Sequence, residues 1–328
     1  MREVSHLAST QAQRGLSPME FRHDLTIVRK HTPRQNWETM AGDIAHARFA
    51  HEGHLRLEVV DNWRRLLPTL EARSWVQLPE LLDNSEQVRK HLMRHPVHAG
   101  PSFDTRGGAP VTLESAVPPF ACYRPEQILT APGLLEQFND AKLLDLIEAF
   151  MGCVPTLYSV NAWWTLPAAS PDMVNVQYFH RDDDDWRFVV LFVYLSDVDA
   201  DSGPHQIIPG SHSIAGLQRL ACADPEATFQ ESMGVDFSQR MEKELGAAAE
   251  SIVGRAGTMF LANTTALHRG LVPKTNPRLI AWARYGLAPN TNSIDNFQGP
   301  SARSLLPTRL ADTPRLRHVN RLLVDFDG

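Results

Sequence analysis

The chain has 328 residues, of which 43% are hydrophobic and 21% charged, and its mean hydropathy is −0.27. These values are typical of a globular protein that is long enough to bury a large core. The net charge of −6 argues against a dedicated nucleic-acid-binding protein, which usually carries a basic face. We find no run of 18 apolar residues and no apolar signal-peptide core at the N-terminus, and therefore expect a cytoplasmic protein without a membrane span.

The cysteines and the general pattern of the chain favour a single domain in a reducing compartment. Cys122, Cys153 and Cys222 are odd in number and show no CxxC spacing, so we expect three small core residues and no metal ligand or nucleophile among them. The chain shows no internal repeat, no low-complexity segment and no convincing domain boundary. We therefore treat 1–328 as one domain.

The first half of the chain favours helices and loops. Residues 1–60 form a polar N-terminal extension, in which His46, His51 and His54 lack the HExxH pattern and are better explained by a solvated helix face than by a metal site. Residues 61–155 are expected to form helical and loop support. Within them, 61–95 shows a helical pattern, 96–136 is rich in proline, glycine and serine, and a clear helix begins at Asn139 or Asp140 and continues to Phe150.

After this helix the apolar period changes from 3.6 to 2 residues, which predicts β-strands. Six segments rich in β-branched and aromatic residues follow, at 156–166, 174–180, 187–196, 205–211, 257–265 and 278–288. Many short strands separated by turn signals are typical of an antiparallel sandwich or jelly roll. We predict a mainly β (α+β) fold with flanking helices. Its parts are a jelly-roll core at 156–288, an insert at 214–257 that is a lid or a surface helix over one sheet, and a C-terminal tail at 289–328 that forms a solvated helix.

One pair of residues in the β-rich half suggests metal chemistry. His180 and Asp182 are two residues apart at the entry to an apolar strand, so their side chains are expected on one face. The pair alone is weak evidence, but His268 lies at the end of a second β segment. Two imidazoles and one carboxylate on one face of a metal ion leave three positions open, as non-haem Fe(II) oxygenases prefer. Asp183 should face away, and Asp184 lies one step further from the histidine, so Asp182 is the preferred ligand.

Two further histidines and a run of acidic residues surround this pair. His205 and His212 lie at the two ends of HQIIPGSH, and we expect both to be turn or hydrogen-bonding residues rather than ligands. The aspartates at 183–185 are expected to bind a cationic or amine-bearing substrate or to meet solvent. The residues Trp163, Trp164, Trp186 and Arg187 are candidates for the lining of a substrate pocket, although aromatic residues at strand positions are often core residues.

The segment from about 143 to 285 resembles the phytanoyl-CoA dioxygenase-like family of Fe(II)/2-oxoglutarate-dependent oxygenases. The resemblance is carried by the pattern Gln177-x-x-His180-x-Asp182, by YLSDVD and SGPHQIIPGSH, and by LHRG followed by Pro277-Arg278. It covers close to half of the chain, with these motifs in the family's order. It implies a double-stranded β-helix, a cupin-like form of jelly roll, in agreement with the strand pattern.

The resemblance also implies roles for individual residues. His180, Asp182 and His268 would be the iron ligands, and Gln177 would hydrogen-bond the cosubstrate near the metal. Arg278 would form a bidentate salt bridge to the C5 carboxylate of 2-oxoglutarate, a task that suits a planar guanidinium better than a lysine. Arg284 is an alternative partner for this carboxylate. It lies six residues further along the same strand, hence on the same face, and periodicity does not separate the two arginines.

The expected protein is thus a non-haem Fe(II)/2-oxoglutarate-dependent dioxygenase that hydroxylates, or otherwise oxidises, a C–H bond of a small-molecule metabolite. It would consume O₂ and release succinate and CO₂. Desaturation, ring closure and epimerisation share this chemistry, so the three ligands allow each of them. A cupin-type isomerase or a dioxygenase that needs no 2-oxoglutarate is one alternative, and it would have little use for Arg278. A non-catalytic jelly roll that binds a ligand is the other, and it would not need an intact ligand set.

Overall fold

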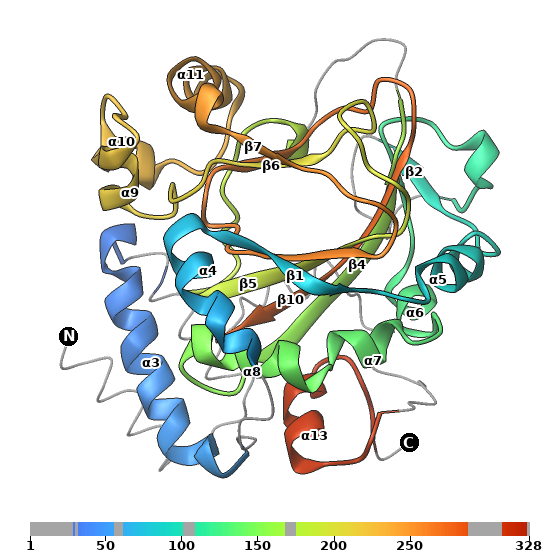
Figure 1. The fold of residues 1–328 in the computed structure, drawn as a ribbon, viewed down its shortest axis with the longest axis horizontal. Coiled ribbons are helices and arrows are strands. Elements are labelled where there is room, and N and C mark those ends of the chain that lie inside the picture. The colour runs from blue at the N-terminus through green and yellow to red at the C-terminus, as the bar shows by residue number, and fades with distance from the viewer. Residues whose placement is uncertain are drawn as a thin grey trace.

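In the computed structural model the described residues are 29, 32–55, 62–100, 109–167, 175–287 and 310–326. They contain two antiparallel sheets that face each other across an apolar interior, with helices on the outside (Figure 1). The prediction of a mainly β core with flanking helices is confirmed. The larger sheet consists, in sheet order, of β1 (Trp75–Leu81), β8 (Thr258–Ala262), β5 (Phe188–Tyr194), β10 (Arg278–Gly286), β4 (Thr156–Thr165), β3 (Phe120–Cys122) and β2 (His98–Gly100). The smaller sheet consists of β7 (Glu250–Ile252), β6 (His205–Ile207) and β9 (His268–Gly270).

Strand β10 decides which side chains face the interior between the sheets. It pairs with β4 on one side and β5 on the other, and all nine of its residues are buried. Its odd-numbered residues, 279 to 285, pack in the core beneath the helices, whereas Ile280 and Trp282 belong to the cluster between the two sheets. Because side chains alternate along a strand, Arg278 and Arg284 share the inner face with Ile280 and Trp282.

Helices cover the outer face of the larger sheet. The predicted helix at 139–150 is confirmed as α8 (Ala141–Met151), which starts where the Asp140 side chain accepts hydrogen bonds from the Lys142 and Leu143 N–H groups, at 2.9 and 3.1 Å. It ends at Gly152, whose φ of +81° favours glycine. The helices that accompany it are α3 (Trp37–Glu52), α4 (Leu67–Arg73), α5 (Ser85–Leu92), α6 (Pro125–Leu129), α7 (Leu134–Phe138) and α13 (Pro314–Asn320).

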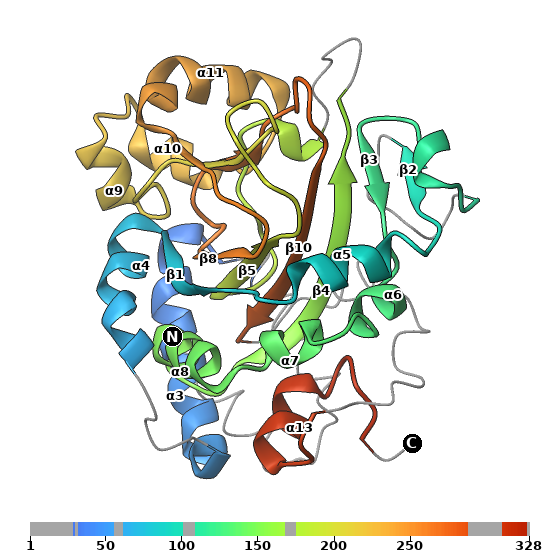
Figure 2. The same cartoon turned by 45° about the vertical axis from the view of Figure 1, so that its right-hand side comes forward.

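The segment predicted as an insert, 214–257, contains α9 (Ile214–Arg219), α10 (Pro225–Gln230) and α11 (Val235–Leu245), followed by β7 of the smaller sheet. Figure 2 shows these three helices gathered at one corner of the molecule. Phe237 and Met241 of α11 pack with Phe179, Ile208 and Leu267, which lie next to the segments that carry the candidate ligands. Within the described residues, this packing fits a surface helix that covers the smaller sheet.

Two predicted elements are wrong. The helical pattern assigned to 61–95 is interrupted by β1, in which Val76 and Leu78 are buried and Gln77 between them is exposed, as expected for a strand. The segment 174–180 was predicted as a strand but contains a 3-10 turn, Asn175–Gln177, and a single bridge at His180. Its backbone groups bond elsewhere, since the N–H of Phe179 donates to the Ser238 hydroxyl, so no continuous ladder forms.

Other expectations for the supporting regions have mixed outcomes. His46, His51 and His54 are exposed, so the prediction of a solvated face is confirmed. The loop prediction for 96–136 missed β2, β3, α6 and α7. The tail was predicted as a solvated helix, which is wrong for part of α13, because Arg315 is buried and forms a 2.5 Å ion pair with buried Glu148. No described helix is long and apolar enough to cross a membrane.

The three cysteines are buried and unbridged, as predicted. Burial raises the pKa of Cys122 to about 12 and that of Cys153 to about 11. Because the thiolate is the reactive form, these two side chains behave as small core residues.

Candidate metal centre

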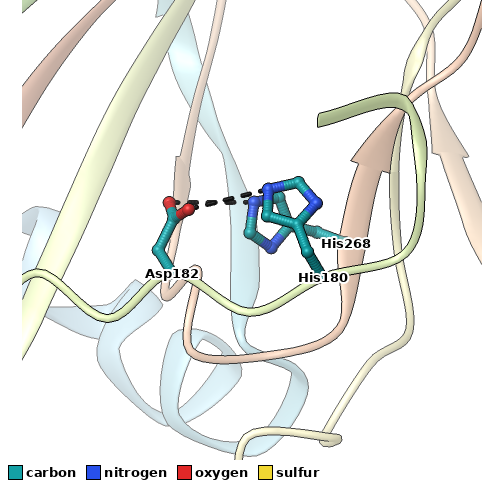
Figure 3. Close-up of side chains that lie close together, drawn as sticks. All are labelled: His180, Asp182 and His268. Atoms are coloured by element: carbon teal, nitrogen blue, oxygen red, sulfur yellow. Dashed lines mark ion pairs between the residues drawn. The ribbon is translucent and has the colours of Figure 1, made fainter. Parts of the chain in front are cut away.

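The structure brings His180, Asp182 and His268 together, as the sequence predicts (Figure 3). Nε2 of His180 lies 3.6 Å from Oδ1 of Asp182, and Nε2 of His268 lies 3.7 Å from Oδ2 of the same carboxylate. One ligand atom from each residue lies within 4.8 Å of the others. Two imidazole nitrogens and one carboxylate oxygen this close together can bind a single divalent transition-metal ion and leave part of its coordination sphere open.

The backbone holds the two histidines side by side. The N–H of His180 donates to the carbonyl of His268, and the N–H of His268 donates to the carbonyl of His180, both at 3.0 Å. Nδ1 of His180 lies 2.8 Å from the Tyr178 carbonyl, and Nδ1 of His268 lies 3.0 Å from the Ala266 carbonyl. A proton on each Nδ1, donated to these carbonyls, leaves each Nε2 with a free lone pair directed at Asp182.

Charge also prepares the three side chains for a cation. Burial acts to raise the pKa of Asp182, but His268, Arg284 and His180 outweigh it, and the pKa lies below its usual value. Burial, together with His180, lowers the pKa of His268 to about 3. Near neutral pH the group therefore offers an ionised carboxylate and a neutral imidazole, which are the protonation states that bind metals.

Asp182 is fixed by its surroundings. Its N–H donates to the carbonyl of Thr264 at 2.9 Å, and Nη2 of Arg284 lies 3.8 Å from its Oδ2. Nε of Arg284 lies 3.1 Å from Oδ2 of Asp184, which also accepts a 2.9 Å hydrogen bond from the hydroxyl of Tyr158. A chain of charged and polar groups thus runs from the buried strand β4 to the candidate ligand.

The three side chains open onto a cavity of about 60 Å³ between the two sheets. The cavity is also lined by Trp163, Val176, Phe192, His205, Gly270, Arg278, Ile280, Trp282 and Arg284. Both arginines proposed from the sequence therefore face the same space. Their partners differ.

Arg278 is buried, and no acid among the described residues forms an ion pair with it. Its Nη1 donates to the Gly203 carbonyl and its Nη2 lies 3.2 Å from the Thr165 hydroxyl, while its buried Nε has no hydrogen-bond partner in the described part of the chain. Burial lowers the pKa of Arg278, and among the described residues the Tyr194 hydroxyl opposes this effect. Arg284, in contrast, is paired with two carboxylates. A buried guanidinium without a counter-ion is costly, so of the two arginines Arg278 has more to gain from an anionic partner.

Other residues singled out from the sequence lie in varied places. Gln177 is buried in the 3-10 turn, and its neighbour Val176 lines the cavity, whereas Gln177 is not among the described lining residues. His212 bonds the Ser74 hydroxyl at 2.7 Å and, through burial, has its pKa lowered to about 4, as expected for a hydrogen-bonding residue. His205, which was expected to be a turn or hydrogen-bonding residue and not a ligand, begins the predicted strand 205–211 and is not one of the three candidate ligands. It lies on β6 inside the cavity, a position that depends on how the sheets assemble.

The expectation that the aspartates at 183–185 meet substrate or solvent is wrong for two of them. Asp184 is engaged by Arg284 and Tyr158, and Asp185 is fully buried and accepts a hydrogen bond from the Trp186 N–H. Asp183 is half exposed and forms a 2.8 Å ion pair with Arg29. Of the proposed pocket residues, Trp163 lines the metal-side cavity, and Trp164 packs in the core beneath the helices. Trp186 and Arg187 line a separate cavity of about 550 Å³ beside α3.

Comparison with known proteins adds a family and several similar folds. Residues 126–276 match the model of the phytanoyl-CoA dioxygenase (PhyH) family. Among solved structures, the chain is similar to HygX from Streptomyces hygroscopicus with nickel, 2-oxoglutarate and hygromycin B bound, at 15% identity and a TM-score of 0.47, covering 69% of this chain and 87% of HygX. It is also similar to EctD from S. alaskensis with bound Fe, at 16% identity and a TM-score of 0.45, covering 70% of this chain and 79% of EctD. No curated protein matches the chain.

Proposed function

We propose that this chain is a PhyH-like Fe(II)/2-oxoglutarate-dependent oxygenase, in which His180, Asp182 and His268 hold the iron and Arg278 holds the cosubstrate. The donor set fits the metal, since two imidazoles and a carboxylate on one side leave open positions for a cosubstrate and O₂. Gln177 is proposed to assist cosubstrate binding near the metal.

The observation that carries this proposal is the buried Arg278 in the same cavity as the three candidate ligands. An arginine that lacks an acid partner inside a protein is stabilised by a carboxylate that arrives with a ligand. A 2-oxo acid with a second carboxylate can reach the metal with one end and the guanidinium with the other. A cupin-type enzyme that needs no 2-oxoglutarate would have no use for this arginine, so that alternative is not favoured.

The bound iron would supply the oxidising chemistry, in which O₂ and 2-oxoglutarate are consumed and succinate and CO₂ are released. The residues of the chain orient the reactants. Arg284 forms one ion pair with the carboxylate of Asp182 and is itself held by a second ion pair with Asp184, and the carbonyls of Tyr178 and Ala266 fix the two imidazole rings. The aromatic lining, including Trp163 and Trp282, limits the water that reaches the reacting atoms. We propose that the substrate is a small molecule and that the outcome is hydroxylation of a C–H bond.

The test is cosubstrate binding without turnover. Anaerobic addition of Fe(II) and 2-oxoglutarate to the wild-type protein should give a visible charge-transfer band, and the band should be lost in His180→Ala and in Arg278→Ala. Arg278→Lys should recover little, because lysine keeps the charge but lacks the bidentate geometry. Arg240→Ala, on the exposed face of α11, is the matched control and should leave the band unchanged. A wild-type protein that gives no band and forms no succinate with O₂ would refute the proposal.

A further inference from the structure

His205 lies in the candidate site but has no part in the function described so far. It is buried on β6 and lines the same 60 Å³ cavity as the candidate metal ligands and Arg278. Its ring stacks on that of His268, with centroids 5.4 Å apart and planes 20° apart. It is therefore a third imidazole next to the metal group, although it is not a member of it.

The strand register places His205 beside the guanidinium of Arg278. His205 pairs with Gly270 across β6 and β9, and Ile207 pairs with His268 one step along the same ladder. Nη2 of Arg278 lies 2.8 Å from the point that a Cβ on Gly270 would occupy. Side chains directly opposite in an antiparallel pair have Cβ atoms about 4.5–5.5 Å apart, so the His205 ring stands next to this guanidinium. His205 lies between His268 and Arg278. A dicarboxylic acid that reaches from the metal to Arg278 would therefore pass beside His205.

The surroundings of His205 do not explain why a polar ring is present. The ring packs against Phe192 and Phe260, with centroids 4.8 and 5.5 Å apart, and its buried Nε2 has no hydrogen-bond partner among the residues that the structure describes. A leucine or phenylalanine could fill this apolar position without leaving a buried polar atom unsatisfied, which is costly. A ligand in the cavity would supply the missing partner.

We infer that His205 is a cosubstrate-binding residue whose imidazole donates a hydrogen bond to the distal carboxylate of 2-oxoglutarate, beside Arg278. This inference rests on the proposed function and refines it. Two donors of different shape, a guanidinium and an imidazole, then hold one carboxylate from two sides. Such a site selects 2-oxo acids that carry a second carboxylate over those that lack one.

The experiment compares two 2-oxo acids in three proteins. Dissociation constants of 2-oxoglutarate and of 2-oxobutanoate, which has no distal carboxylate, are measured anaerobically with Fe(II) for the wild type, His205→Leu and His205→Gln. His205→Leu should weaken 2-oxoglutarate at least about tenfold, the loss expected for a hydrogen bond to a charged group, and leave 2-oxobutanoate nearly unchanged. His205→Gln keeps a donor and should recover part of the affinity. His46→Leu, on the exposed face of α3, is the matched control.

Each other outcome overturns the inference in a recognisable way. Unchanged 2-oxoglutarate affinity in His205→Leu, with a normal band in the wild type, would refute the role of His205 and leave the proposed function intact. An equal loss for both acids would indicate a packing role, and a loss of Fe(II) affinity would indicate a metal ligand. A wild-type protein that binds neither acid would refute the proposed function itself, and the inference with it.

Discussion

The substitution Gly270→Ala tests the geometry of the cosubstrate site most directly. The new methyl carbon would lie 2.8 Å from Nη2 of Arg278 and 3.7 Å from its Nη1 and Cζ. The first distance is shorter than any stable contact, so the guanidinium must move. It is the far end of a flexible side chain, and Gly270 lies in the regular strand β9, so the backbone should accept the change with little loss of stability.

The expected effect falls on cosubstrate affinity. A displaced guanidinium loses its place beside the Gly203 carbonyl and the Thr165 hydroxyl and can no longer meet a carboxylate at the same point. Hydrogen bonds to charged groups contribute about 1.5–3 kcal/mol, so the affinity for 2-oxoglutarate should fall by about 10- to 150-fold. Anaerobic titration of the Fe(II) protein with 2-oxoglutarate measures this loss.

The matched control is Gly42→Ala in helix α3, where no atom lies within 4 Å of the added carbon. It should leave 2-oxoglutarate binding unchanged and raise stability by about 0.5–1 kcal/mol, because alanine favours a helix over glycine. If Gly270→Ala binds 2-oxoglutarate as tightly as the wild type, Arg278 does not hold the cosubstrate in the position described. If Gly270→Ala instead unfolds, Arg278→Ala is the variant that tests whether Arg278 holds the cosubstrate.

Four further substitutions probe other parts of the structure. Asp182→Ala should abolish Fe(II) binding, whereas Asp184→Ala should keep it and only lower the melting temperature. Equilibrium dialysis with Fe(II) distinguishes the two variants. If Asp184→Ala loses Fe(II) and Asp182→Ala keeps it, the carboxylate ligand is misassigned. Arg315→Met should cost about 3–5 kcal/mol in chemical denaturation, because it removes the guanidinium that forms an ion pair with buried Glu148. Binding of 2-oxoglutarate should persist in the folded protein, and an unchanged midpoint would contradict the burial of this pair. Burial acts to raise the pKa of Glu52, but His318 and Arg48 lower it to about 2. Its stabilising effect is therefore complete above about pH 5 and lost as the pH falls toward 2. Glu52→Gln should destabilise the protein at pH 7 and not at pH 2. A difference in unfolding free energy between the wild type and Glu52→Gln that is the same at both pH values would refute this.

The sequence predicted the strands that are defined by local pattern. The segments that form β4, β5, β8 and β10 are rich in apolar residues, and almost all of these residues are buried. Their local pattern of apolar, β-branched and aromatic residues identified them as strands. Strand β1 was missed because its short alternating run lies between two helices and gains its stability from pairing with β8, far away in the sequence. A strand at 174–180 was wrongly predicted, because the sequence does not show which backbone groups have distant partners.

The same limit applies to the site. His180, Asp182 and His268 were identified by spacing and order along the chain. Arg278 and Arg284 occupy equivalent faces of β10, so no local rule distinguishes them; the difference comes from Asp182 and Asp184, which reach only Arg284. His205 was expected to be a turn or hydrogen-bonding residue at the start of the predicted strand 205–211. Its place in the cavity follows from the pairing of β6 with β9, which no short-range signal encodes.

If Arg278 binds 2-oxoglutarate as proposed, its burial links the stability of the folded protein to the concentration of this cosubstrate. A ligand that binds only the folded state adds stability in proportion to the logarithm of its concentration, about 2.7 kcal/mol at one hundred times the dissociation constant. Part of that gain comes from the pairing of the buried guanidinium, because burying a charge without a counter-ion costs free energy. Protein molecules without bound dicarboxylate would therefore unfold more often and be cleaved faster by proteases. The lifetime of the protein would then rise with the concentration of 2-oxoglutarate.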